Sequence, residues 1–167
     1  MGNWNLLTLR QRSAYFLALS EVVFSRWLSQ SRDVVLARKA VELGWEGWSL
    51  GKVECLEFET IVMPPSEDGL YMAFLTSDTS AEQSAWRCVM DMVSYLGYYY
   101  CQSCGIDNVP QSIENVPSVD VKGDFDSYFD QAIAEGHKVR DEVIVKIAET
   151  EELTRDSIMV IASQAGV

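Results

Sequence analysis

The chain has 167 residues, of which 48% are hydrophobic and 11% aromatic, and its formal net charge is −12. This length and composition predict one folded domain over residues 1–167 and argue against a disordered chain. The longest apolar run, at 70–75, is far shorter than the ~20 residues of a membrane span, and no signal-peptide pattern opens the chain. We therefore expect a cytoplasmic protein that does not bind membranes.

The acidic charge is concentrated after residue 45. Residues 46–167 hold 22 acidic and seven basic side chains, whereas residues 1–45 hold three acidic and six basic ones. Such a field repels phosphate backbones and speeds the encounter with a basic partner. The charge disfavours direct nucleic-acid binding. It leaves two interpretations, an acidic recognition surface or charge that serves only solubility.

Two helices are expected in the first fifty residues. The first carries two adjacent apolar faces over 14–28, so it should pack on more than one side. Glu21 lies within one of these faces, and we expect it to be exposed at the edge. Asp33 is a suitable N-cap for the second helix, and Gly51 is suitably placed to close it.

Residues 53–79 have the least regular pattern of the chain. Short apolar runs alternate with acids, and Pro64-Pro65 prevents one continuous element. We expect a short helix near 53–62 and a second near 69–75. A short irregular or hairpin segment is the alternative.

A long apolar helix follows, over about 80–104. Thr79 and Glu82 fit a capping box that starts it at Ser80. Because apolar residues cover most of its circumference, this helix should lie at the centre of a bundle. The fold class is therefore all-α, a single-domain multi-helix bundle.

The remaining chain also has helical spacing after a proline-containing loop. Asp124 or Asp126 is expected to cap a long helix, in which Gly136 is a candidate kink. Thr154 should begin a last helix. The stretch 146–167 has the rhythm of a helix-turn-helix, but its acidic surroundings argue against DNA binding.

The cysteines raise the question of a metal or redox site. Cys101 and Cys104 are three residues apart at the end of the central helix. A structural zinc site needs four ligands, and neither Cys55, Cys88 nor the single histidine, His137, is paired at short spacing. A redox dithiol usually sits at the start of a helix instead. We expect reduced thiols that serve packing, and neither a metal nor a cofactor.

Catalytic signatures are also missing from the sequence. It contains no GxSxG, HExxH or phosphate-binding glycine motif. Carboxylates are plentiful, but nothing selects one pair for acid–base catalysis. The sequence therefore does not predict an enzyme.

What remains is a surface for binding another protein. Residues 46–91 hold nine acids against Lys52 and Arg87, with Phe58, Tyr71 and Phe74 as candidate exposed aromatics. Acids can steer a basic partner and aromatics can anchor it. The alternative is that each acid merely solvates a helix face. The predicted binding residues are Glu46, Glu54, Glu57, Phe58, Glu59, Glu67, Asp68, Tyr71, Asp78 and Glu82.

Five motifs in this order resemble a known family. They are YFLALSEVVF (15–24), AVELGWEGW (40–48), DGL (68–70), SAWRCVMDMVSYLGYYY (84–100) and VPQSIENV (109–116). Over about residues 7–117 the chain is similar to the all-helical immunity proteins of bacterial polymorphic-toxin systems, immunity family six. The resemblance implies a small cytoplasmic protein that binds and blocks a toxin domain.

Taken together, the residues and the resemblance predict non-catalytic inhibition of a toxin. Since many such toxins are basic nucleases, the acidic region 46–82 is the expected interface. The alternative is an acidic helical adaptor with another protein partner. The sequence leaves open whether the chain forms a homo-oligomer.

Overall fold

The structure, a computed structural model, describes residues 4–64, 68–111 and 113–165. Within these ranges it contains helices and no strand, which confirms the all-α prediction and shows that a hairpin at 53–79 is wrong. The α-helices are α1 (Leu9–Arg26), α2 (Val34–Trp48), α3 (Cys55–Val62), α4 (Leu70–Leu75), α5 (Ser80–Ser103), α6 (Val121–Ala132), α7 (Gly136–Glu149) and α8 (Arg155–Ala165). Short 3₁₀ helices lie at Trp4–Leu6, Leu28–Gln30 and Val116–Ser118.

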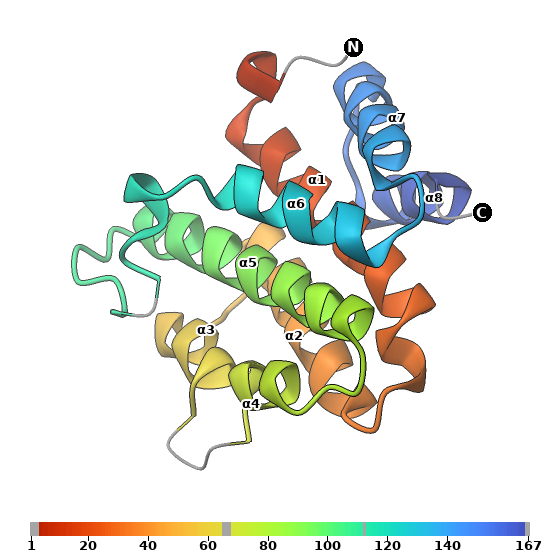
Figure 1. The fold of residues 1–167 in the computed structure, drawn as a ribbon. Coiled ribbons are helices and arrows are strands. Elements are labelled where there is room, and N and C mark those ends of the chain that lie inside the picture. The colour runs from red at the N-terminus through yellow and green to blue at the C-terminus, as the bar shows by residue number, and fades with distance from the viewer. Residues whose placement is uncertain (1–3, 65–67, 112, 166–167) are drawn as a thin grey trace.

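Helix α5 lies at the centre of the bundle, as predicted. It packs against α1, α2, α3, α4 and α6, and Figure 1 shows α6 on one side of it and α3 and α4 on the other. The Thr79 hydroxyl caps its first turn by accepting a hydrogen bond from Glu82 N at 3.1 Å. The same chemistry starts α8, where Thr154 Oγ1 accepts from Ser157 N at 3.1 Å.

Helix α1 is buried on most of its surface, which confirms that it packs on several sides. It contacts α2, α5, α7 and α8. The expectation that Glu21 is exposed is wrong, because only 6% of this residue is exposed. Its carboxylate accepts hydrogen bonds from Arg38 Nη1 at 3.1 Å and Trp45 Nε1 at 2.9 Å. A buried carboxylate is tolerated when partners on a neighbouring helix satisfy it.

The end of α2 differs in detail from the prediction. Asp33 precedes the helix as expected, but its side chain makes no capping hydrogen bond. After Trp48 the left-handed residue is Leu50, with a φ of 56°, and not Gly51. Gly51 N still closes the helix by donating to Glu46 O at 2.8 Å.

The predicted long C-terminal helix is two helices. The chain breaks between α6 and α7, where Glu135 has a φ of 56°. Asp120, and neither Asp124 nor Asp126, caps α6, by accepting a hydrogen bond from Gly123 N at 2.9 Å.

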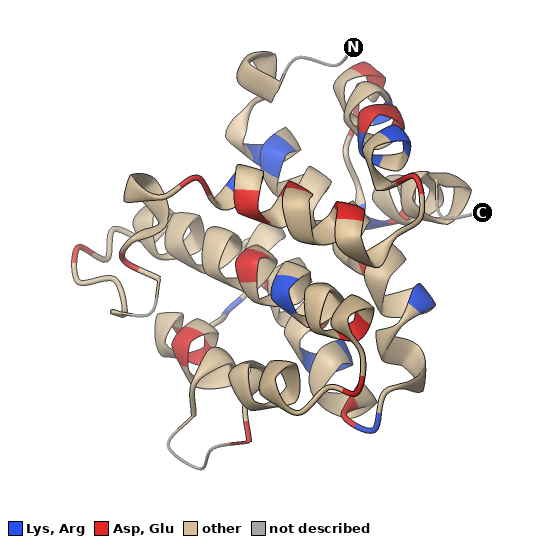
Figure 2. Ribbon diagram, in the orientation of Figure 1, with Lys and Arg blue, Asp and Glu red and all other residues tan. Residues whose placement is uncertain are grey.

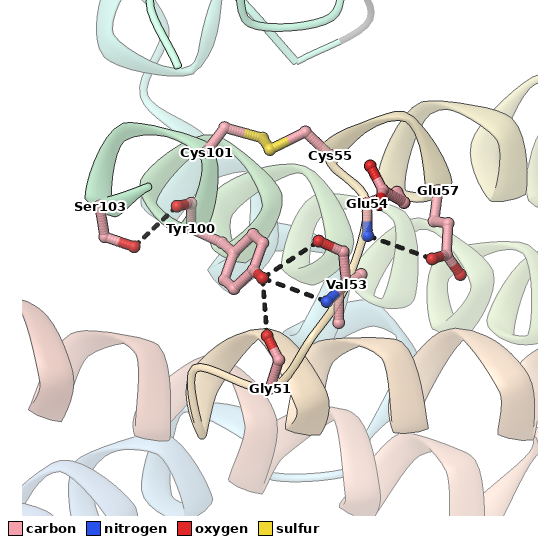
Figure 3. The surroundings of a disulfide bond; sticks show 8 residues. All are labelled: Gly51, Val53, Glu54, Cys55, Glu57, Tyr100, Cys101 and Ser103. Atoms are coloured by element: carbon pink, nitrogen blue, oxygen red, sulfur yellow. Dashed lines mark hydrogen bonds between the residues drawn. A yellow bond between two sulfur atoms is a disulfide. The ribbon is translucent and has the colours of Figure 1, made fainter. Parts of the chain in front are cut away.

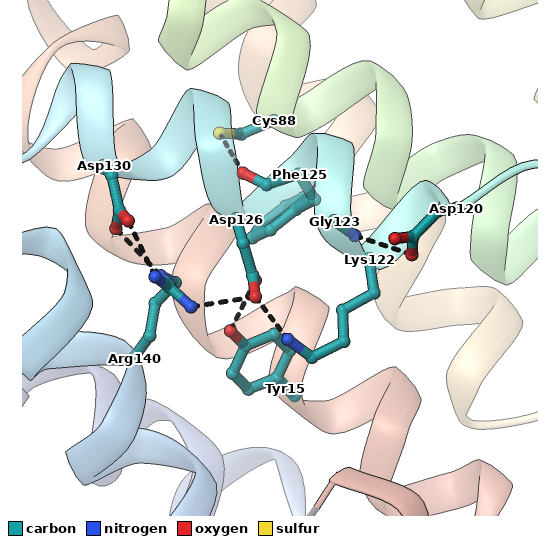
Figure 4. A network of polar contacts seen from close by, with 9 residues as sticks. All are labelled: Tyr15, Cys88, Asp120, Lys122, Gly123, Phe125, Asp126, Asp130 and Arg140. Atoms are coloured by element: carbon teal, nitrogen blue, oxygen red, sulfur yellow. Dashed lines mark hydrogen bonds and ion pairs between the residues drawn. The ribbon is translucent and has the colours of Figure 1, made fainter.

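Asp126 instead joins three helices from a buried position. It accepts hydrogen bonds from Tyr15 Oη at 2.7 Å and Arg140 Nη1 at 2.8 Å, and it pairs with Lys122 (Figure 4). Arg140 also binds both oxygens of Asp130, at 2.8 and 2.7 Å. Burial, and then the neighbouring Asp126 carboxylate, raise the pKa of Tyr15 far above its usual value. This network fixes α1, α6 and α7 against one another.

Candidate interaction surface

Helices α2 and α3 form the walls of a cleft, and Pro64, Asp68 and Gly69 add to its lining. Its volume is about 490 Å³. Positions three and four apart lie on one face of a helix, and α2 lines the cleft with Leu36, Lys39, Glu42, Leu43 and Glu46. The opposite wall is made of Glu57, Thr60 and Ile61 from α3, followed by Pro64, Asp68 and Gly69.

Four carboxylates and one ammonium group line this α2–α3 cleft. Glu42 is engaged by Arg155 Nη2 at 2.5 Å and by Arg38 Nη1 at 3.6 Å. Glu57 accepts one hydrogen bond, from Glu54 N at 3.2 Å. The exposed Glu46 carboxylate has no hydrogen bond or ion pair with any residue that the structure describes. The cleft therefore has a negative potential that attracts cations.

Two smaller hollows lie toward the start of α2, next to the cleft. One of about 240 Å³ shares Leu36, Asp68 and Gly69 with it. A third, of about 110 Å³, shares Arg32 and Asp33 with the second and also contains Asp78 and Glu82. We call the three hollows together the acidic groove. Figure 2 shows acidic residues on α3, before α4 and at the start of α5, around this part of the molecule.

Large apolar side chains are exposed beside these acids. Leu56 of α3 and Met63, directly after it, are 63% and 60% exposed, and Tyr71 and Leu75 of α4 are also exposed. Apolar side chains rimmed by charge are typical of a surface that binds another protein. The exposure expected for Tyr71 is confirmed.

The exposure expected for Phe58 is wrong, because none of this residue is exposed. Its ring lies against α5, with its centroid 5.7 Å from that of Tyr100. Gly97 allows this approach, since a Cβ there would lie 2.7 Å from the Phe58 ring. Helical spacing places Phe58 on the inner face of α3. Phe74 is half-buried beside Tyr71.

The structure brings half of the predicted binding residues to the acidic groove. Glu46, Glu57 and Asp68 lie in the cleft, and Asp78 and Glu82 lie in the third hollow. Outside the three hollows are Glu54, Phe58, Glu59 and Tyr71, whereas Glu67 lies outside the described residues.

Sequence reasoning missed Asp33, Lys39 and Glu42 as residues of this groove. Glu42 is four residues before Glu46, so helical spacing alone already placed the two acids on one face of α2. Lys39 and Asp33 continue that helix toward its start. Helical spacing therefore contained this signal, but the acidic region was defined as a continuous range of the sequence and not as the residues on one helix face.

A disulfide between Cys55 and Cys101 joins α3 to α5, with the Cα atoms 5.6 Å apart (Figure 3). The prediction that all four thiols are reduced is wrong for this pair. Cys101 and Cys104 also differ in surroundings, because Cys101 is buried and Cys104 is exposed. Cys101 and Cys104 therefore do not form a shared metal or redox site, although they are three residues apart. Cys101 instead anchors the α3 wall of the cleft.

Tyr100 anchors the same wall from the next position. Its hydroxyl donates to Gly51 O at 2.7 Å and accepts from Val53 N at 3.1 Å (Figure 3). The segment between α2 and α3 is thus fixed to α5 beside the disulfide.

A pocket without acidic residues, an alternative to the groove, lies between the start of α1 and the ends of α2 and α5. This pocket has a volume of about 310 Å³ and includes Trp48, Tyr99 and Tyr100. The Arg10 guanidinium lies 3.8 Å from the centroid of the Trp48 ring. No carboxylate lines the pocket, so it lacks the charge that distinguishes the acidic groove.

In the part of the chain that the structure describes, the His, Cys, Asp and Glu side chains form no group of three that could hold a metal ion. None of the helices described there combines the length and apolar character needed to cross a membrane. His137 is exposed at the start of α7, as expected. The acidic groove is therefore the strongest candidate site.

Comparison with known proteins gives one family. The model of the family described as immunity protein Imm6 matches residues 11–131, which is most of the chain. The match includes α2, α3, α4 and α5, and hence the whole acidic groove, whereas α7 and α8 lie beyond it. No curated protein and no solved structure is significantly similar to the chain.

Proposed function

The chain belongs to the Imm6 family of immunity proteins, and from this membership we propose that it neutralises a basic toxin domain through its acidic groove. Membership makes the chain an immunity protein of a polymorphic-toxin system with a toxin as its protein partner. The proposal adds the chemistry of the partner, a nuclease domain, and the place of their encounter, the cytoplasm.

The observation that carries the proposal is the acidic groove with exposed apolar side chains beside it. A nuclease binds the phosphate backbone with Lys and Arg, so the surface around its active site is basic. Acids such as Glu46 and Asp78 complement that charge, while Leu56, Met63 and Tyr71 provide area that a partner can bury.

Inhibition in this proposal is binding and involves no chemical step. The negative field accelerates the encounter with the toxin, and well-packed apolar contacts then slow dissociation. Once bound, the protein occupies or caps the surface where nucleic acid would lie. One immunity protein neutralises one toxin domain.

The test is co-expression with the toxin domain encoded by the neighbouring gene, scoring growth and co-purification. We expect rescue and a one-to-one complex whose affinity falls as salt rises. Reversing Glu46, Asp78 and Glu82 together should weaken binding, whereas reversing the exposed Glu149, Glu151 and Glu152 should not. Rescue without salt dependence would contradict the acidic interface. A toxic neighbour that is neither bound nor neutralised would favour the adaptor.

A further inference from the structure

The α2–α3 cleft is a recess, and its depth bears on what the partner presents. Its volume of about 490 Å³ lies within the range of sites that enclose small ligands. Leu43 and Ile61, each 6% exposed, lie at its floor, and Glu46 and Glu57 are exposed at its rim. We propose that a toxin loop inserts lysine or arginine side chains into this cleft. The inference rests on the proposed function and specifies its contact.

The layering of the cleft matches these two side chains. Lysine and arginine combine an apolar stem with a charged head. Leu43 and Ile61 would contact the stem, while Glu46 and Glu57 would pair with the head. A purely apolar side chain would leave the rim carboxylates desolvated without a partner. A flat basic surface would leave the apolar floor uncovered.

The carboxylates of the cleft differ in their availability. Glu42 is engaged by two arginines of its own chain, at 2.5 and 3.6 Å. Glu46 has no partner within the described residues, and Glu57 accepts a single hydrogen bond from its own helix. Glu46 and Glu57 are therefore the acids that pair with the inserted cation.

Lys39 is the ammonium group already present in the cleft. It is exposed and makes no ion pair with a described residue. An inserted cation meets repulsion from this group, because like charges in one recess oppose each other. Removing the charge of Lys39 while keeping its apolar stem should therefore strengthen binding, and a partner that presents acids would show the opposite effect.

The walls of the cleft are held in place before binding. The buried Phe58 ring and the hydrogen bonds of the Tyr100 hydroxyl to Gly51 and Val53 fix the α3 side to α5. A site that is already formed loses less conformational freedom when its partner binds. The α3 wall of the cleft is therefore preorganised, which lowers the entropic cost of binding.

The experiment measures affinity for the purified toxin domain identified by co-expression, using variants that separate charge from shape. Glu46→Gln with Glu57→Gln removes the rim charge, Thr60→Trp fills the cleft, and Lys39→Met removes the competing cation. We expect the first two changes each to weaken binding about 30-fold or more and Lys39→Met to tighten it about threefold. Matched controls are the exposed pair Glu149→Gln with Glu151→Gln, and the exposed Ser163→Trp. Circular dichroism and thermal midpoints verify that each variant is folded.

The outcomes separate this inference from the proposed function. Wild-type affinity for Thr60→Trp, with growth rescue intact, would overturn insertion and leave a flat acidic contact. Unchanged affinity for the double glutamine variant would show that the rim carboxylates are not used. Weaker binding of Lys39→Met would overturn the choice of a cationic side chain. If the wild-type chain neither binds nor rescues, the proposed function itself fails.

Discussion

The α3–α4 flank and the α6–α7 flank both pack on the core of the bundle, but they use their acids differently. On the α6–α7 flank, Asp126 and Asp130 are occupied by Arg140, Lys122 and Tyr15. The α3 wall is held by the Phe58 ring, the disulfide and the Tyr100 hydroxyl instead.

The difference shows why net charge alone does not locate a binding surface. Carboxylates that hold helices together are already paired within the chain and offer little to a partner. The α3 wall is held by apolar and covalent contacts instead. The Glu46 carboxylate and the remaining acceptor positions of the Glu57 carboxylate are therefore available to a partner. Substitutions on each flank can therefore test this division between paired and available acids.

The largest loss of stability is expected where the α3 wall depends on one apolar ring. Phe58→Ala should lower the free energy of unfolding by about 3–5 kcal/mol, because it removes a fully buried ring and leaves a cavity. Urea unfolding measures the change. The half-buried Phe74 on α4 is the control, and Phe74→Ala should cost clearly less. A loss below about 1 kcal/mol for Phe58→Ala would mean that this ring does not hold α3.

On the opposite flank the corresponding change is electrostatic. Asp126→Ala should lower the free energy of unfolding by about 3 kcal/mol, because it leaves Arg140, Lys122 and the Tyr15 hydroxyl without their shared acceptor. Asp126→Asn keeps an acceptor for Tyr15 and should cost less. Chemical unfolding of both variants gives the comparison. Equal losses would indicate that the hydrogen bond with Tyr15 matters little and that charge dominates.

These two flanks also mark what could be predicted from the sequence. Local signals were sufficient for the apolar pattern of α5, its cap at Thr79 and the short helices around Pro64-Pro65, because each depends on neighbouring residues. The predictions that were wrong concern residues whose partners are distant in the chain. Glu21 is buried because Arg38 and Trp45 approach it from α2.

The same reason explains the errors at the candidate site. Phe58 points inward because Gly97, on another helix, leaves room for its ring, and Cys55 finds Cys101 across 46 positions of sequence. The acidic character of 46–82 was readable from the chain. Which of its acids share one cleft depended on how α2 and α3 pack, and no local pattern gives that packing.

An intermediate effect is expected from the disulfide. Cys101→Ser should lower the free energy of unfolding by about 2–3 kcal/mol under oxidising conditions, because the bond restricts a 46-residue loop in the unfolded chain. Adding dithiothreitol should bring the wild type close to the variant. Thermal unfolding with and without reductant measures both. The exposed Cys104 is the control, since Cys104→Ser should behave like the wild type in either condition.

The smallest change in stability is expected at Asp91 on α5. This acid is neither well paired, like those of the α6–α7 flank, nor exposed, like those of the cleft. It is only 8% exposed, its Oδ2 has no hydrogen-bond partner among the described residues, and Arg87 Nε lies 3.4 Å from Oδ1. Burial raises the pKa of Asp91 to about 7, against a smaller opposing effect of Arg87. This carboxyl is therefore neither paired as well as Asp126 nor exposed as Glu46 is.

How Asp91 affects stability at each pH depends on its protonation in the folded and in the unfolded chain. Below about pH 4 the group is protonated in both, whereas between about pH 4 and 7 only the folded chain keeps the proton. Ionisation is thus disfavoured by folding, and Asp91 lowers stability increasingly as pH rises toward 7. Asp91→Asn should be about 1–2 kcal/mol more stable than the wild type at pH 8, less than the full difference in pKa implies because the amide is also buried. At pH 4 the two should agree closely.

Urea unfolding from pH 4 to 8 measures this difference, with the exposed Asp141 on α7 as the control, since Asp141→Asn should shift the curve little. Parallel curves for Asp91→Asn and the wild type would show that Arg87 fully compensates the buried charge. Asp91 would then belong with the paired acids of the α6–α7 flank. A gap that opens with pH would instead separate three conditions of a carboxylate in this fold: paired and stabilising at Asp126, buried and destabilising at Asp91, and exposed for a partner at Glu46.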